Sequence, residues 1–297
     1  MTKSLTVKIV NGFVSGGAGG NPAGVVLDAD YLTDAEMQRI AAAVGLSETA
    51  FVSASETEAF RLDFFTPNSR IAHCGHATVA TFSYLASLSR VAEDNTSKET
   101  IEVPRKILLQ NGAAFLEQLA PSYRAEADWA DSDVTDAAVL DSLGLGKNQL
   151  IPGCPPLAVS TSMGFMNVGV KSSAILARVT PDLEAILAIS EPLDLVGFYV
   201  FTTETSTPGH AVSARMFAPR YGIDEESATG MAAGPLACLL HDRLRVAGDT
   251  IVIEQGMFMA PPSPSLLEAL LDLKGDAITG FMVGGFGAVI EDREIDY

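Results

Sequence analysis

Three side chains that can bind metals or react with substrates lie close together in the segment PNSRIAHCGHATVATFSYL, residues 67–85: His73, Cys74 and His76. They stand where an irregular segment becomes an apolar run with helical spacing. Imidazoles transfer protons, thiolates attack electrophiles or bind metals, and the N–H groups at the start of a helix bind anions. The segment is therefore compatible with a metal site, a nucleophilic thiol with its base, or an anion-binding helix N-terminus.

A metal site is the least favoured of these three interpretations. Structural zinc takes four ligands, usually as two pairs whose members are a few residues apart. The chain has four histidines and three cysteines, and no second cluster completes a set of four. The cysteines, Cys74, Cys154 and Cys238, are odd in number and scattered, which argues against a disulfide framework and favours the reducing cytoplasm. We expect neither a metal nor a cofactor.

A carboxylate follows the best-defined helix signal of the chain, in LTDAEMQRIAAAVGLSETAFVSAS, residues 32–55. Thr33 and Glu36 are spaced as a capping box, and apolar residues then recur at helical spacing. Gly45 can adopt the left-handed conformation that ends a helix. Glu48 falls in the link before the next strand. A glutamate in this place is either a solvated loop residue or an acid/base held at a cleft, and the pattern alone does not choose.

The two halves of the chain are similar in sequence. RLDFFTPNSRIAHCGHAT and SARMFAPRYGIDEESATGM each describe a strand that ends at a proline, a turn, and small residues that open an apolar helix. Upstream of them, FVSASET and VFTTET also correspond. These matches, which occur in the same order in both halves, indicate an internal duplication. We expect two similar lobes whose matching helix N-termini face each other across a cleft.

The two helix N-termini predict a shared function. Free N–H groups and the helix dipole allow CGHAT and SATGM to hold a carboxylate or an oxyanion, although small residues also serve close packing in buried helices. Glu226 precedes the second helix in a run of acids that is also typical of a solvated turn. With Glu48 and His76 it would form a set able to move protons. Cys74 could act as base or nucleophile, but its counterpart is Ser227, which disfavours a symmetric two-thiol racemase.

Composition excludes several classes of protein. The net charge of −18 argues against nucleic-acid binding, because a phosphate backbone would be repelled. No apolar run reaches the roughly 18 residues of a membrane span, and the start of the chain lacks the pattern of a signal peptide. A chain of 297 residues with 47% hydrophobic content predicts a globular protein of two domains.

The chain resembles the PhzF family of phenazine biosynthesis-like proteins. The resemblance covers nearly the whole chain, and the motifs that carry it are NPAGVVL, GLSETAFV, CGHATVA, RMFAP, ATGMAAGPL and IEQG. It implies the α+β fold of diaminopimelate epimerase, with two similar lobes that each wrap a curved, mostly antiparallel sheet around a central helix. We expect residues 1–125, completed by the C-terminal strand 282–297, to form one lobe and residues 126–281 the other. The resemblance also implies a homodimer.

The best-known activity of the family is the cofactor-free isomerisation of trans-2,3-dihydro-3-hydroxyanthranilate, in which a glutamate moves a proton between carbons. Glu48 matches that glutamate, and Gly75 and His76 match a glycine and a histidine that contact the substrate. The chain departs from the family where Asp-Pro-Ala-Thr-Gly-Ser becomes the sequence from Glu226 to Met231. It also has no arginine in Ala-Pro-Pro-Ser, residues 260–263. A lost hydroxyl and a lost cation change which substrate groups can be satisfied.

We therefore expect a cofactor-independent isomerase of a small carboxylate. Glu48 would be the general acid/base, with a pKa raised by partial burial, and His76 and Glu226 would position the substrate or relay protons. The alternatives are a Cys74-dependent epimerase or racemase of an amino acid derivative, and a non-catalytic protein that binds a small metabolite. The residues expected to bind the substrate are Asn21, Gly75, Ala77, Thr229, Gly230 and Met231.

Overall fold

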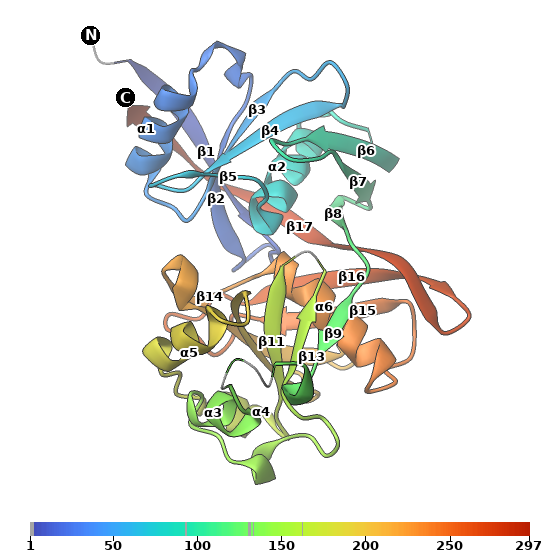
Figure 1. Ribbon diagram of the computed structural model, residues 1–297. Coiled ribbons are helices and arrows are strands. Elements are labelled where there is room, and N and C mark those ends of the chain that lie inside the picture. The colour runs from blue at the N-terminus through green and yellow to red at the C-terminus, as the bar shows by residue number, and fades with distance from the viewer. Residues whose placement is uncertain (1–2, 93, 130–131, 133, 162) are drawn as a thin grey trace. The chain divides into compact units, whose positions relative to one another are not determined.

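The capped helix expected after residue 32 forms as the sequence predicts. In the computed structural model, which describes residues 3–92, 94–129, 132, 134–161 and 163–297, helix α1 spans Asp34–Val44 (Figure 1). Thr33 and Glu36 cap each other reciprocally, and Gly45 ends the helix at φ +71°. Met37 and Ile40 are among the residues of its buried face. Local capping and apolar spacing therefore determine this helix.

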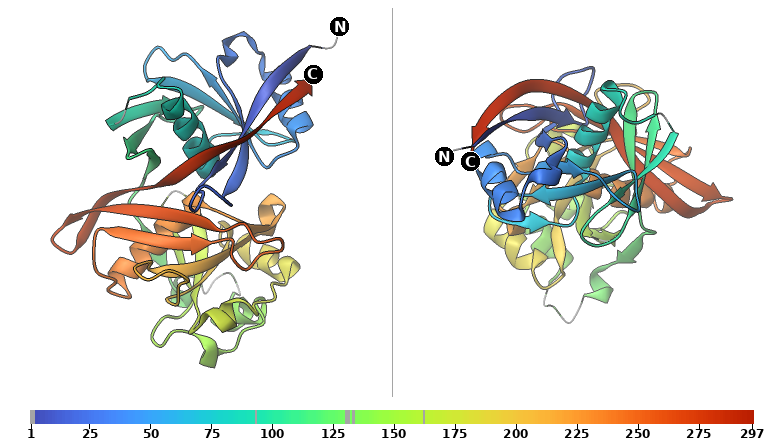
Figure 2. Two further views of the ribbon diagram at one scale, coloured as in Figure 1. Left: turned by 180° about the vertical axis from the view of Figure 1, so that it is seen from behind. Right: turned by 90° about the horizontal axis from the view of Figure 1, so that it is seen from above.

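The chain divides into two compact units, Met1–Glu117 with Gly284–Tyr297, and Gln118–Val283. The boundary near residue 117 comes earlier than the expected position after residue 125. The reason is that strand β9, Ser122–Arg124, pairs with β10, Leu157–Ser160, of the second unit. From Gly284 onward the C-terminal segment belongs to the first unit, where it pairs antiparallel with β1 (Figure 2).

The described residues of the first unit form a mixed sheet with the α-helices α1 and α2. Strand β1 pairs antiparallel with β2, β2 parallel with β3, β3 antiparallel with β4, and β4 parallel with β6. Its elements, besides α1, are β1 Ser4–Gly12, β2 Asn21–Val26, β3 Thr49–Ser53, β4 Phe60–Phe65, β5 Arg70–Ile71, α2 Gly75–Ser87, β6 Asp94–Glu99, β7 Arg105–Gln110, β8 Ala113–Gln118 and the end of β17 Ala277–Asp296.

The second unit repeats this order of pairings. Strand β10 pairs antiparallel with β11, β11 parallel with β12, β12 antiparallel with β13, and β13 parallel with β15. The shared pattern is the structural counterpart of the repeated sequence motifs. Its other elements are α3 Asp136–Asp141, β11 Gly164–Gly169, α4 Ser173–Leu176, α5 Leu183–Ser190, β12 Leu195–Thr202, β13 Val212–Ala218, β14 Ile223–Glu226, α6 Gly230–Asp242, β15 Thr250–Gln255, β16 Ser265–Lys274 and the start of β17.

Each unit has one helix that is buried on nearly all its sides. Helix α2 contacts β1, β2 and β3, and α6 contacts β10, β11 and β16. Both helices are rich in alanine and other small residues, and most of their side chains are buried. A helix that is apolar on all sides is stable only when it is buried. This explains why α2 and α6 are each covered by strands. The fold is therefore α+β and rich in sheet. Among the described residues, no helix has the length and apolarity needed to span a membrane.

Candidate functional site

The first turn of α2 and the link after α1 bring three reactive side chains together. Nε2 of His76 lies 3.2 Å from Oε2 of Glu48, and Sγ of Cys74 lies 3.5 Å from Nδ1 of His76. Cys74 is the N-cap residue of α2, and His76 follows in the first turn. All three side chains are largely shielded from solvent. We call this group the Glu48–Cys74–His76 cluster.

The backbone around the cluster is held by strands β1 and β2. The carbonyl oxygen of Glu48 accepts a hydrogen bond of 3.0 Å from the N–H of Gly24 on β2. Asn21, at the start of β2, is buried and pairs with Gly12 at the end of β1. Gly12 in turn lies against the carbonyl of His76. The strands therefore fix the place of Glu48 and of the first turn of α2.

Gly12→Ala is expected to disrupt this arrangement. A Cβ at position 12 would lie 2.5 Å from the carbonyl oxygen of His76, which is backbone and cannot rotate away. We expect a loss of about 1–3 kcal/mol in the free energy of unfolding, the typical effect of overpacking, together with a displaced His76. Urea unfolding measures the first effect and histidine NMR the second. Gly16→Ala, where nothing lies within 4 Å but φ is +59°, shows the effect of backbone strain without a clash and should leave the His76 resonances unchanged. Wild-type stability and unchanged His76 resonances in Gly12→Ala would contradict the steric explanation.

Glu48 and His76 form a buried ion pair. Burial acts to raise the pKa of Glu48, but the charge of His76 and hydrogen bonds from His76, Ser47 and Cys74 lower it below its ordinary range. Burial acts to lower the pKa of His76, but its hydrogen bond to the Cys74 sulfur and the charge of the Glu48 carboxylate raise it well above its ordinary range. The expectation of a raised pKa for Glu48 was therefore wrong for the resting protein, because the neighbouring imidazolium outweighs burial.

One oxygen of this carboxylate has no well-formed hydrogen bond. Oε2 of Glu48 is buried and makes no hydrogen bond of good geometry with any residue that the structure describes; its contact with His76 is an ion pair. A carboxylate oxygen can accept more than one hydrogen bond, so Oε2 keeps acceptor capacity beyond its ion pair with His76.

Cys74 is a protonated, packed thiol in the resting protein. It is 6% exposed, and burial followed by the charge of Glu48 raises the pKa of its thiol. The helix N-terminus, which could lower a thiol pKa, is therefore outweighed here. The three donor atoms of the cluster all lie within 4.8 Å of one another, a spacing that a zinc ion would accept. Zinc would have to displace the proton of His76 and that of Cys74.

The pKa values of the two histidines beside Cys74 are expected to be shifted in opposite directions. Burial and the charge of Lys98 lower the pKa of His73 to about 4, whereas His76 is raised well above 6.5. At pH 6, therefore, His73 should be neutral and His76 charged. Because the pKa of His76 is raised on folding, the stability that its charge contributes is complete below about pH 6.5. This stability is lost as the pH rises through the pKa of His76 in the folded protein. NMR titration of the four histidines, assigned with His73→Gln and His76→Gln, measures the pKa values of His73 and His76. If both histidines titrated near pH 6.5, the opposite shifts would be contradicted.

In the second unit, Gln255 holds the segment before α6. Its Nε2 donates to the carbonyl of Glu226 at 2.7 Å, and its Oε1 accepts from the N–H of Thr229 at 3.2 Å and from the hydroxyl of Tyr199 at 2.8 Å. The hydroxyl of Thr229 donates to the carboxylate of Glu226 in a short contact. Gln255 lies in the motif IEQG, but its role and that of Tyr199 were not expected, because the contacts join residues far apart in sequence.

The other expected substrate-binding residues take ordinary positions at the helix N-termini. Gly75 and Gly230 are the first residues of α2 and α6, so their N–H groups have no partner within the helix. Ala77 is buried within the first turn of α2, and Met231 is partly exposed in the first turn of α6. The expected residues thus form one group in each unit.

Comparison with known proteins gives the family and the fold. A family model described as phenazine biosynthesis-like protein matches residues 10–292. An uncharacterized isomerase of Deinococcus radiodurans is 32% identical over 91% of this chain and 88% of its own. The trans-2,3-dihydro-3-hydroxyanthranilate isomerase of Pseudomonas chlororaphis is 30% identical over 94% of this chain and 95% of its own.

Solved structures with the same fold include a PhzF family phenazine biosynthesis protein of Bacillus anthracis. It is 26% identical, with a TM-score of 0.86 over 99% of both chains. A hydroxyproline epimerase of Agrobacterium vitis has a TM-score of 0.61 over 99% of this chain and 92% of its own. Because that epimerase is 13% identical, it shows the shared fold alone.

Proposed function

The chain belongs to the phenazine biosynthesis-like family, whose named relatives include isomerases, and on that premise we propose that it shifts a proton on a small cyclic or amino-acid-like carboxylate without a cofactor. The observation that carries the proposal is the buried, ionised carboxylate of Glu48, whose Oε2 makes no well-formed hydrogen bond among the described residues. Its neighbour, the His76 imidazolium, supplies the charge that such a reaction needs.

In the proposed reaction, Oε2 of Glu48 takes a proton from one carbon of the substrate. The electron pair of that C–H bond moves into the substrate, so the negative charge passes from the carboxylate to the substrate. The His76 imidazolium lies beside both charges and stabilises the anion that forms. The neutral Glu48 acid then returns the proton to another carbon. The lowered pKa favours this return, because an acid made stronger by its neighbour gives up its proton readily.

The second unit is proposed to bind the substrate. Glu226, held by Thr229 and Gln255, would accept a hydrogen bond from an amino or hydroxyl group of the substrate. In the first unit the backbone N–H of Gly75 would hold a carboxylate, and in the second unit those of Gly230 and Met231 would do the same. Met231 offers no side-chain donor, which favours a substrate that lacks the hydrogen-bond acceptor a serine would satisfy.

A Cys74-dependent epimerase is the less well supported alternative. A thiol base would have to ionise, yet burial raises the pKa of Cys74. As N-cap residue of its helix, Cys74 corresponds to Thr229 of α6 and not to Ser227, as the sequence spacing had suggested; neither residue supplies a second thiol. Turnover that survives in Cys74→Ala would exclude this alternative, whereas turnover lost only in Cys74→Ala would favour it.

The test is the conversion of trans-2,3-dihydro-3-hydroxyanthranilate by the purified protein in deuterated buffer, followed by absorbance and mass spectrometry. We expect one deuterium to enter carbon in the product, or in the recovered substrate if the overall conversion is slow. A parallel set of small cyclic and amino-acid-like carboxylates tests the substrate class. Absence of both conversion and carbon-bound deuterium with every compound would overturn the proposed function.

A further inference from the structure

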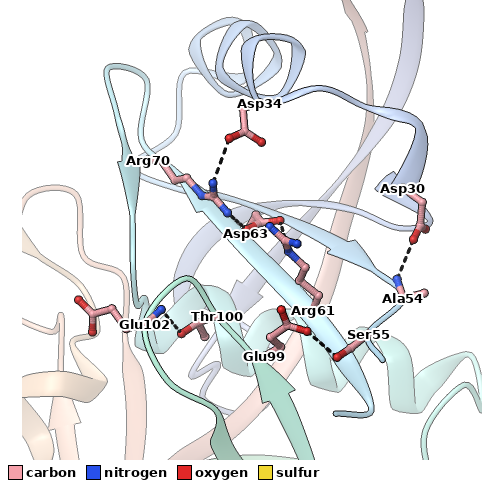
Figure 3. A network of polar contacts seen from close by, with 10 residues as sticks. All are labelled: Asp30, Asp34, Ala54, Ser55, Arg61, Asp63, Arg70, Glu99, Thr100 and Glu102. Carbon is pink, nitrogen blue, oxygen red and sulfur yellow. Dashed lines mark hydrogen bonds and ion pairs between the residues drawn. The ribbon is translucent and has the colours of Figure 1, made fainter. Parts of the chain in front are cut away.

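A fully buried lysine lies against the first turn of α2. Lys98 on β6 is 0% exposed; its Nζ donates to Oγ1 of Thr78 at 2.6 Å and lies 4.6 Å from the centre of the Phe64 ring. In the part of the chain that the structure describes, its charge meets a hydroxyl and an aromatic face, not a carboxylate. The adjacent Glu99 instead accepts a hydrogen bond from Ser55 (Figure 3). Burying an ammonium group in this way is unfavourable, so stability does not explain the lysine.

The second unit shows which residue the fold accepts at the same place. On β6, Lys98 pairs with Phe60 of β4, and on β15, Ile253 pairs with Val212 of β13. Phe60 and Val212 each lie the same number of residues before the proline that follows their strand. Ile253 is therefore the counterpart of Lys98, and it is also 0% exposed.

The helix residue that contacts Lys98 is also polar in the first unit and apolar in the second. Thr78 is the third residue after Gly75, the first of α2, and Ala233 is the third after Gly230, the first of α6. A lysine–threonine pair in the first unit thus corresponds to an isoleucine–alanine pair in the second. The fold does not need the polar pair, and the pair occurs only in the unit that holds the Glu48–Cys74–His76 cluster.

The hydrogen bonds of Thr78 lead from Lys98 to the cluster. The hydroxyl of Thr78 donates to the carbonyl oxygen of Cys74 at 2.6 Å, and the N–H of Thr78 contacts the same oxygen at 3.2 Å. That carbonyl belongs to the same peptide group as the N–H of Gly75. A carbonyl that accepts strong hydrogen bonds makes the N–H of its peptide a better donor, because connected hydrogen bonds polarise one another.

We propose that Lys98 is a positioning residue, a role that rests on the proposed function. It holds the first turn of α2 through Thr78 and polarises the peptide between Cys74 and Gly75, so that the Gly75 N–H binds the substrate's carboxylate more tightly. Lys98 itself touches neither the substrate nor the atoms that react.

The charge state of Lys98 should make the stability of the fold depend on pH. Burial lowers the pKa of Lys98 to about 7, and the charge of Arg105 on β7 also lowers it; Cys74 would raise it only as a thiolate. His73, the other titratable neighbour, has a pKa of about 4 and is neutral near pH 7. Because the folded pKa lies below the unfolded value of 10.5, the buried charge destabilises the fold most below pH 7, and this loss disappears as pH rises towards 10.5.

The test compares Lys98→Met and Thr78→Val with Thr78→Ser, which keeps the hydroxyl, and with Lys106→Met on the protein surface. With trans-2,3-dihydro-3-hydroxyanthranilate as probe, the first two variants should raise KM about 2-fold to 5-fold with kcat unchanged, because the Gly75 N–H remains and loses only the roughly 10–30% strengthening that connected hydrogen bonds supply. Thr78→Ser and Lys106→Met should match the wild type. At pH 6 the melting temperature of Lys98→Met should equal or exceed that of the wild type. An unchanged KM in Lys98→Met or Thr78→Val would overturn the proposal.

A ligand-free measurement separates this proposal from the proposed function. The amide ¹⁵N resonance of Gly75 should shift in Lys98→Met and Thr78→Val and return to its wild-type position in Thr78→Ser. If the wild type fails to convert the probe but this pattern appears, the proposed function is at fault and the role of Lys98 stands. If the Gly75 resonance is the same in all variants, the role of Lys98 is wrong. Thr78→Val and Thr78→Ser decide the matter if Lys98→Met does not fold.

Discussion

Glu48→Gln is expected to lower kcat by about 10³-fold, within the roughly 10²- to 10⁴-fold that one general acid/base contributes. Glutamine keeps the shape of the side chain but cannot carry a proton between carbons. The measurement is the initial rate of proton shift and of deuterium incorporation with the best substrate found for the wild type. KM should change less than kcat, because the lost group acts on the transition state.

The matched control is Glu99→Gln in the same unit. Glu99 accepts a hydrogen bond of 2.6 Å from Ser55, which a glutamine oxygen can also accept (Figure 3). The control should therefore keep the rate and stability of the wild type. A Glu48→Gln variant that keeps more than about one tenth of the wild-type kcat would show that another group is the base.

The pH dependence of stability checks the charge state of Glu48 separately. Folding lowers the pKa of Glu48 from 4.5, so the carboxylate's contribution to stability is complete above about pH 4.5. This contribution is lost as the pH falls through the pKa of Glu48 in the folded protein. Glu48→Gln should therefore be less stable than the wild type at pH 5.5, and the difference should shrink as the pH is lowered further. A constant difference would contradict the assigned charge.

Glu225→Gln is expected to lower the free energy of unfolding of the second unit by about 3 kcal/mol. Both oxygens of Glu225 accept hydrogen bonds of 2.8 Å from Arg215. Arg215 is 7% exposed and also donates to the carbonyls of Leu176 and Val179. Removal of the negative charge leaves a guanidinium that is buried and unpaired. Urea unfolding followed by the fluorescence of Trp129, the one tryptophan of the chain and a buried residue of this unit, measures the loss.

Asp194→Asn is the control for this pair. Asp194 accepts a hydrogen bond of 2.9 Å from Arg220, but its side chain is 90% exposed. An exposed ion pair contributes about 0–1 kcal/mol, so the control should unfold close to the wild type. Equal losses in Glu225→Gln and Asp194→Asn would show that burial does not determine the energy of these pairs. Glu226 follows Glu225 on β14, so a loosened pair should also disturb the proposed substrate-binding group.

Several features follow from the sequence because they depend on residues close together in the chain. The capping box of Thr33 and Glu36 and the left-handed Gly45 are confirmed, since caps require only neighbouring residues. The membership of the phenazine biosynthesis-like family is confirmed, since its motifs are short and ordered. The repeated motifs also correspond to the same sequence of strand pairings in the two units.

The exact limits of the units were not predictable. The sequence suggested a division after residue 125, within a polar segment, but β9 pairs with β10 and therefore belongs to the second unit. Strand pairing joins residues whose separation in sequence carries no local signal, so a polar stretch marks a connection without showing where a sheet begins.

The sequence by itself placed Glu48 and His76 among the candidate residues, and only the tertiary structure decided their charges. Partial burial alone would raise the pKa of Glu48. The pKa is lowered instead, because the imidazole of His76 lies 3.2 Å away. The same is true of Lys98, which in the sequence is an unremarkable lysine of a polar strand and in the structure is fully buried behind Thr78. Residue types and spacing determine which groups can ionise, but a pKa depends on distances and solvent access, and these exist only after folding.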